Sequence, residues 1–250
     1  NGDLTQGRKY PNELVSTREA DQQLIAIANL RPWLEIPNVE AIRLAHGTGS
    51  HGFGESSIDY LVAERLQGMA PDKDISSVRH GLLSVDEVTF DYAHHGPTPG
   101  IRQWTLGNQV RYYTRSLMND EILRGRTPPR VVVRSHYHAY VRETVRVPMG
   151  DGEAVTDAFV TPSYCHLTEY ATQATRSAYL IGCGLVACEV VDGALREIYP
   201  FTRCTDLRRV SASRIPDRSF CPARSGRRCG ACGSGRRPRP FRRCARPSRP

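Results

Sequence analysis

The sequence has no apolar run long enough to cross a membrane, and no segment with the charged start and apolar centre of a signal peptide. Lysine is scarce, since Lys9 and Lys73 are the only two in 250 residues. Cysteine is sparse before residue 200, where three scattered thiols are typical of buried residues in a reducing compartment rather than of a disulfide framework. We therefore expect a cytoplasmic protein without a membrane partner.

Charge divides the chain near residue 200. Residues 1–200 carry 17 Arg and 2 Lys against 24 acidic residues, a net charge of −5, whereas residues 201–250 carry 15 Arg and two acidic residues, a net charge of +13. The 39% of hydrophobic residues is enough for the core of one large domain or two small ones. We predict a folded domain over residues 1–203 and a separate tail over 204–250.

The tail is rich in Arg, Pro, Gly and Cys and has no hydrophobic periodicity, which is typical of disorder. It has three interpretations. A basic arm could bind nucleic acid through its phosphates. A zinc site could use Cys221, Cys229, Cys232 and Cys244, although only one Cys-x-x-Cys pair is present. The composition also resembles that of a GC-rich gene read out of frame.

Helical and strand patterns alternate over residues 1–203, which predicts an α/β domain. Helices are expected over residues 13–29, where Pro32 would stop the first, over 58–66, with Ser56 or Ser57 as cap, and over 104–123. Strands are expected over residues 39–45, as a pair within 77–94, from 131, and as two hairpins that turn near residues 150–152 and 192–193.

The β-branched run Val131-Val132-Val133 leads into two histidines, His136 and His138. In an extended backbone, residues two apart point the same way, so both imidazoles would face one cavity from the end of a buried strand. Two converging imidazoles favour a transition metal ion such as Zn, Mn, Fe or Ni. The alternative is a pair of histidines in a surface loop.

Three further segments beside predicted elements carry residues that can bind a metal, or glycines that let the backbone approach a ligand closely. These are Asp3 before the first helix, the glycine-rich segment from His46 to Gly52, and the pair His94-His95. Loops that follow the strands of an open α/β sheet gather at one edge, where sites form. One acid, several histidines and a glycine-rich loop are together typical of a metal-assisted hydrolase.

The order of these segments resembles the calcineurin-like metallophosphoesterase superfamily, and the sequences of the loops are most similar to those of its phage and prophage members. The matching motifs are Gly2-Asp3, Gly49-Ser50-His51, His94 or its neighbour His95, and Ser135-His136-Tyr137-His138. The resemblance implies a four-layer α/β/β/α sandwich with two metal ions that activate water. It implies that Asp3 bridges both ions, that His94 or His95 is a ligand, and that His136 binds the second ion and His138 the first.

Two departures from the family pattern matter. Ser50, or Thr48 in another alignment, stands where the family has the asparagine ligand of the second metal. The family's histidine that stabilises the phosphate or protonates the leaving oxygen is present as His51. The family's first motif, Asp-x-His, has no counterpart, so we expect the first strand to be missing from this chain. We therefore predict at most one metal, held by Asp3, His94 and His136, and little activity.

The resemblance implies a phosphate-ester substrate, such as a nucleic acid or a nucleotide, and a reaction without covalent modification of the protein. Two alternatives stay open. The chain could be an inactive metallophosphoesterase-like binding protein, or a nucleic-acid binding protein that acts through its basic tail. The sequence predicts no oligomeric state.

Overall fold

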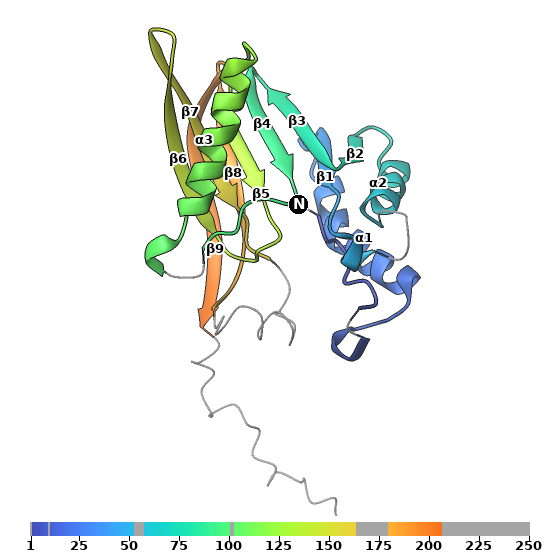
Figure 1. The fold of residues 1–250 in the computed structure, drawn as a ribbon. Coiled ribbons are helices and arrows are strands. Elements are labelled where there is room, and N and C mark those ends of the chain that lie inside the picture. Colours follow the sequence, from blue (N-terminus) through green and yellow to red (C-terminus); the bar gives the residue numbers. More distant parts are fainter. Residues whose placement is uncertain (1, 10, 53–57, 101–102, 164–179, 207–250) are drawn as a thin grey trace, which may run out of the picture. The chain divides into compact units, whose positions relative to one another are not determined.

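The computed structural model describes residues 2–9, 11–52, 58–100, 103–163 and 180–206, and Figure 1 shows their arrangement. The helices are α1 (Glu19–Leu34), α2 (Ile58–Met69) and α3 (Asn108–Leu123), with short 3-10 turns at η1 (Pro11–Glu13), η2 (Gly49–His51) and η3 (Gln103–Thr105). The strands are β1 (Ala41–Ala45), β2 (Asp74–Val78), β3 (His80–Val85), β4 (Val88–Ala93), β5 (Val131–Arg134), β6 (Val141–Met149), β7 (Gly152–Val160), β8 (Leu180–Val191) and β9 (Ala194–Asp206). The predicted α/β class is confirmed.

The strands form three sheets in the described part of the chain. Strands β1 and β2 pair in parallel, β8 and β9 form an antiparallel pair, and a five-stranded mixed sheet has the order β3-β4-β5-β7-β6. In the mixed sheet β5 lies between β4 and β7 and is parallel to both. The predicted buried strand is thus central, as its run of valines indicates.

A first hydrophobic core joins α1 and α2 to the β1–β2 sheet. Ile58, Val62 and Leu66 recur every four residues along α2 and are buried against Leu44 of β1 and Ile75 of β2. This spacing places the three side chains on one face of the helix. The predicted helix is confirmed, whereas its predicted caps Ser56 and Ser57 lie outside the described residues.

Helix α1 differs from the sequence prediction at both ends. It begins at Glu19 rather than near residue 13, because the Ser16 hydroxyl accepts a hydrogen bond from the backbone of Arg18 and forms a local turn before the helix. It continues through Pro32 to Leu34, so the prediction that Pro32 stops it is wrong. Proline costs most in a helix interior, and here it stands in the last turn.

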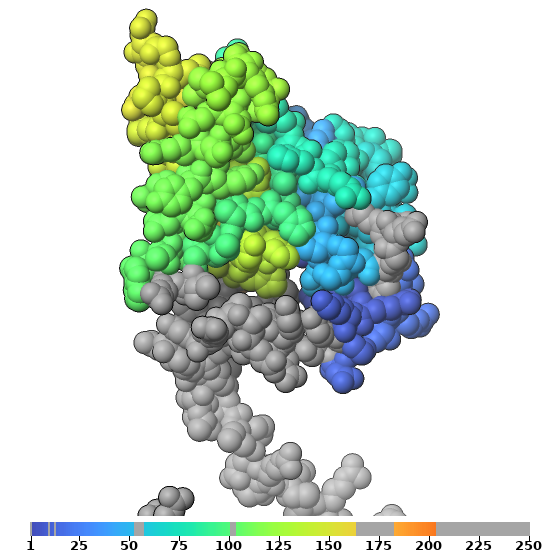
Figure 2. Space-filling model, in the orientation of Figure 1, coloured from blue at the N-terminus to red at the C-terminus, as the bar shows by residue number. Residues whose placement is uncertain are grey.

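A second core lies between α3 and the five-stranded sheet. Val110 of α3 packs with Val132, Val141, Ala158 and Val160 of β5, β6 and β7. Figure 2 shows α3, in green, against the β6–β7 hairpin, in yellow. The structure places this helix at Asn108–Leu123, within the predicted range.

Both predicted hairpins are present in the described residues. Strands β6 and β7 turn at Gly150-Asp151, and β8 and β9 turn at Asp192-Gly193, where both residues have positive φ. Strand β2 was not expected, because Ser76 and Ser77 interrupt its apolar pattern. None of the helices in the described ranges combines the length and the hydrophobicity that a membrane span requires.

Strand β9 ends at Asp206, so it includes Cys204, Thr205 and Asp206, the first residues of the predicted tail. Residues 207–250, with the cysteines Cys221, Cys229, Cys232 and Cys244, lie outside the described part of the chain. The three interpretations of the tail therefore stay predictions.

Candidate metal centre

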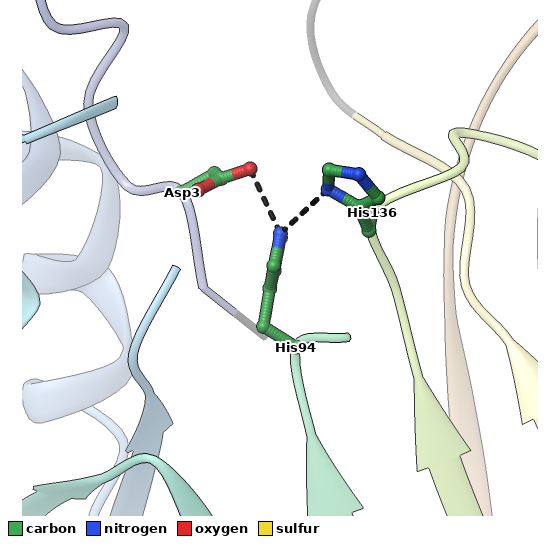
Figure 3. Close-up of side chains that lie close together, drawn as sticks. All are labelled: Asp3, His94 and His136. Atoms are coloured by element: carbon green, nitrogen blue, oxygen red, sulfur yellow. Dashed lines mark hydrogen bonds and ion pairs between the residues drawn. The ribbon is translucent and has the colours of Figure 1, made fainter. Parts of the chain in front are cut away.

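Side chains from three distant segments meet at one point, as Figure 3 shows. His94 Nε2 lies 2.9 Å from Asp3 Oδ2 and 3.3 Å from His136 Nδ1. One donor atom from each of the three residues lies within 4.8 Å of the other two. These are the three residues that the sequence predicts as ligands of a single metal ion.

The sheet brings the two histidines together. Strands β4 and β5 are parallel neighbours, so the loops that follow them leave the sheet at the same edge. A backbone hydrogen bond of 2.9 Å, from Ser135 N–H to the His94 carbonyl, joins these loops. The predicted convergence of loops at one sheet edge is correct for His94 and His136.

Asp3 is held in place by the glycine-rich segment that follows β1. The Thr48 backbone N–H donates to Asp3 Oδ1 at 2.6 Å, and the Thr48 hydroxyl donates to the same oxygen at 3.1 Å. A Cβ on Gly47 would collide with Asp3, so only glycine permits this approach. The glycine-rich segment was expected to let the backbone approach a bound molecule closely. In the structure its backbone closely approaches Asp3, which is a predicted metal ligand.

The backbone around His136 and His138 corrects the sequence interpretation. Strand β5 ends at Arg134, and both histidines have positive φ, of 73° and 54°. They therefore do not alternate along an extended strand, and only His136 belongs to the cluster with Asp3. Asp3 also has positive φ, of 53°. For a non-glycine residue this conformation costs about 1–3 kcal/mol, and such strain gathers at functional sites.

Electrostatics prepare Asp3 and His136 to donate electron pairs. Burial alone would raise the pKa of Asp3, but the hydrogen bond and charge of His94, with the charge of His51, lower it to about 2. The pKa of His136 is lowered by burial and by repulsion from His94 and His95, partly opposed by Asp3. At neutral pH the site therefore offers a carboxylate and a neutral imidazole, which are the forms that bind metal.

The donor set fits a divalent transition metal. A metal about 2.1 Å from each nitrogen or oxygen donor keeps the donors about 3–3.5 Å apart. Two of the three separations, 2.9 and 3.3 Å, already agree with this requirement. Two imidazoles and one carboxylate occur in catalytic zinc sites and in non-haem iron sites, and such sites leave coordination positions for water or substrate.

The other predicted metal ligands lie near this cluster but outside it. His95 is exposed, and its ring centroid lies 4.8 Å from that of His136. His138 is partly buried, with a pKa lowered by burial and raised in part by Asp3. Ser50 is exposed and its hydroxyl contacts that of Thr48 at 3.0 Å. Of the alternatives His94 and His95, the structure places His94 in the cluster, where its side chain is 3% exposed.

His51 was predicted as the catalytic histidine, and it lies beside the cluster. Its Nε2 is 3.8 Å from Asp3 Oδ2, and its Nδ1 is buried without a hydrogen-bond partner in the described residues. His51 and Asp3 both line a cavity of about 420 Å³. Asp3, one of the three candidate ligands, thus borders a space of the size that holds small ligands.

Asp59 is the residue of the site that was not predicted from the sequence. It lies on the first turn of α2, is 6% exposed, and accepts hydrogen bonds from the backbone N–H groups of Gly47 and Leu4. No sequence signal identifies it, since the fold alone decides which acid is buried. Comparison with known protein families and with curated proteins finds no match to this chain.

Proposed function

We propose that this chain is a metal-dependent phosphoester hydrolase that holds one divalent transition metal ion and turns over slowly. One observation carries the proposal, namely that Asp3, His94 and His136 come from three separate segments and place their donor atoms within 4.8 Å of one another. A further support is their order in the chain, which matches the motif order of the metallophosphoesterases.

Each residue has a distinct part in the proposed reaction. Asp3 supplies the negative charge that holds a cation, and His94 and His136 supply imidazole nitrogens from the ends of two parallel strands. Bound there, a divalent metal ion would act as a Lewis acid toward a phosphoryl oxygen and would lower the pKa of a bound water. No side chain of the protein forms a covalent bond with the substrate.

His51 is the proposed phosphate-binding residue. It lines the cavity next to Asp3 and has one ring nitrogen 3.8 Å from the Asp3 carboxylate. An imidazole here can donate a hydrogen bond to a phosphoryl oxygen, where charge develops, or protonate the leaving oxygen. This is the part that the family resemblance assigns to the histidine of Gly49-Ser50-His51.

The number of metal ions limits the proposed rate. Among the described residues, no second group of three His, Cys, Asp or Glu side chains lies close enough to hold another ion. Two-metal sites clamp both the attacking and the leaving oxygen, and a single ion cannot do both. The proposal is therefore one ion per chain and a slow reaction.

The proposed architecture is a four-layer sandwich. Helices α1 and α2 share a core with the β1–β2 sheet, and α3 shares a second core with the five-stranded sheet. Two helix-covered sheets support this proposed architecture.

The experiment measures metal binding and hydrolysis together. The metal-free chain is titrated with Mn²⁺ or Zn²⁺, and hydrolysis of bis(p-nitrophenyl) phosphate is followed with and without chelator. We expect one ion per chain and a low rate that His136→Ala abolishes, with metal affinity reduced by more than about 100-fold. His95→Ala, at an exposed position beside the cluster, serves as the control and should keep the metal affinity.

Two results would contradict this proposal. One is a hydrolysis rate that neither chelator nor His136→Ala changes, since the reaction would then not use the site. The other is tight binding of one ion without measurable hydrolysis of aryl phosphate esters, which would favour a metal-binding protein without this activity. Circular dichroism of each variant separates loss of the site from loss of the fold.

A further inference from the structure

The cavity beside the metal centre extends to a second group of residues. Besides Asp3 and His51, Arg79 and His80 line it. Arg79 lies in a bend between β2 and β3, and His80 is the first residue of β3. The volume of about 420 Å³ is within the range of pockets for whole small ligands, about 300–1,000 Å³, so there is room for more than one phosphoryl group.

Arg79 brings an uncompensated positive charge to this cavity. It is exposed, and no acidic side chain of the described residues pairs with it. The two acids that line the same cavity have other partners, since Asp3 contacts His94 and Thr48, and Asp59 accepts backbone hydrogen bonds. A guanidinium matches the oxygens of a phosphate in a planar, bidentate geometry, so the free charge favours an anionic group of this kind.

His80 is held rigidly next to Arg79. Its Nε2 lies 2.9 and 3.0 Å from the two carboxylate oxygens of Asp91, and Asp91 pairs at 2.6 Å with Arg134, which is 2% exposed. The opposite charges of Arg134 and Asp91 offset each other, and the Asp91 carboxylate holds the imidazole ring of His80 in place. Asp91 engages only one ring nitrogen, so Nδ1 of His80 is not used by this contact.

We propose that Arg79 and His80 form a subsite for a second phosphate of the substrate. This inference rests on the proposed function, in which the scissile phosphate binds at the metal centre. The substrate class is then a phosphate ester that carries a further phosphate, such as a nucleotide or a nucleic-acid strand, rather than a monoester with an uncharged remainder. Arg79 provides the charge, and His80, whose Nε2–H donates to Asp91, donates a second hydrogen bond from Nδ1 to the phosphate when its imidazole is protonated.

The test measures binding of inorganic phosphate, because the subsite needs no metal. Calorimetric titration of the metal-free chain should show one phosphate site. Arg79→Gln should weaken its affinity by about ten-fold or more, the effect of losing a charge-assisted pair of hydrogen bonds. Arg115→Gln removes the same charge from an exposed position on α3 that has no ion pair with the residues the structure describes, and should leave the affinity unchanged.

Further arms separate this subsite from the metal centre. His94→Ala should leave phosphate binding of the metal-free chain intact, and His80→Gln should weaken it less than Arg79→Gln. After loading with Mn²⁺, the wild-type chain should bind two phosphates and Arg79→Gln only one. If the chain binds no metal, the proposed function fails, whereas the metal-free titration still decides the subsite.

Three outcomes would overturn the subsite. The first is a wild-type chain without saturable phosphate binding. The second is equal weakening by Arg79→Gln and Arg115→Gln, which would be an effect of net charge alone. The third is a phosphate site that is lost in His94→Ala but kept in Arg79→Gln, which would place the anion at the histidines.

Discussion

Asp59 Oδ2 accepts a hydrogen bond of 2.7 Å from the backbone N–H of Gly47, and Oδ1 accepts one of 3.2 Å from Leu4. Leu4 follows the candidate ligand Asp3 in sequence, and Gly47 precedes Thr48, which donates to the Asp3 carboxylate. One buried acid on α2 therefore ties together the two segments that position Asp3. Its hydrogen bonds thereby help to position Asp3 in the candidate site.

Replacing this acid should loosen the site. In Asp59→Asn the amide nitrogen cannot accept a hydrogen bond, so either Gly47 or Leu4 loses its partner. We expect metal affinity to fall by about 10–100-fold, as for other residues that orient metal ligands, and stability to fall by about 1–3 kcal/mol. Competition with a chelator and urea unfolding measure the two effects. Asp72→Asn, at an exposed position without an ion pair in the described residues, should change neither.

Two neighbouring glycines offer a matched pair of substitutions. A Cβ on Gly47 would collide with the side chain and backbone of Asp3, whereas one on Gly49 would have no heavy atom within 4 Å. Gly47→Ala should therefore displace Asp3 and reduce metal affinity, while Gly49→Ala should keep it. Isothermal titration with Zn²⁺ compares them. Equal affinities in the two variants would show that Asp3 does not contribute to the metal site.

His136 and His138 differ in their predicted effect on metal binding. Both have positive φ, so an alanine at either position changes backbone strain in a similar way. Only His136 belongs to the cluster with Asp3 and His94. His136→Ala should reduce metal affinity by more than about 100-fold, and His138→Ala by much less. A large and equal loss would make His138 a ligand too, as the family resemblance implies.

Asp157 makes the stability of the mixed sheet depend on pH. Burial alone would raise the pKa of this carboxyl, but hydrogen bonds from Thr144, Arg130 and Arg142 hold it below 3.8. Because the pKa of Asp157 is lower in the folded protein than in the unfolded one, its contribution to folding stability is present above pH 3.8. This contribution is lost as the pH falls through the folded-state pKa.

Asp157→Asn should therefore cost about 3 kcal/mol at neutral pH, toward the low end for a broken buried pair because both arginines are partly exposed. The difference from wild type should shrink when the pH is lowered below 3.8 toward the folded-state pKa. Urea unfolding at the two pH values measures this change. Asp151→Asn, at the exposed turn between β6 and β7, is the control. A difference that stays constant on acidification would contradict the assigned charge interaction.

Elements with a strong local pattern were predictable. The valine run predicts the central strand β5, because β-branched side chains favour strands. Asp192-Gly193 predicts the turn between β8 and β9, because these residue types supply the positive φ of a tight turn. Helix α1 was less predictable from hydrophobic periodicity. Ser16 acts through a side-chain hydrogen bond before the helix, and the effect of Pro32 depends on its position in the last turn.

The candidate site was predictable in its residue types and not in its geometry. Asp3, His94 and His136 stand out as a carboxylate and imidazoles beside predicted elements. The choice of His94 over His95 depends on which side chain the fold buries, and the separation of His136 from His138 depends on a backbone turn after β5. Asp59 carries no metal-binding pattern, because its contacts are to backbone groups of distant residues.

The sequence by itself determined the α/β class, the central strand, both hairpins and the set of possible ligands, because these follow from side-chain chemistry and from interactions between near neighbours. Tertiary structure alone decided that His94 is buried while His95 is exposed, and that a turn after β5 separates His136 from His138. The contact between Asp3 and His94 joins residues far apart in the sequence, because hydrogen bonds such as that of Gly47 with Asp59 bring distant segments together in the fold.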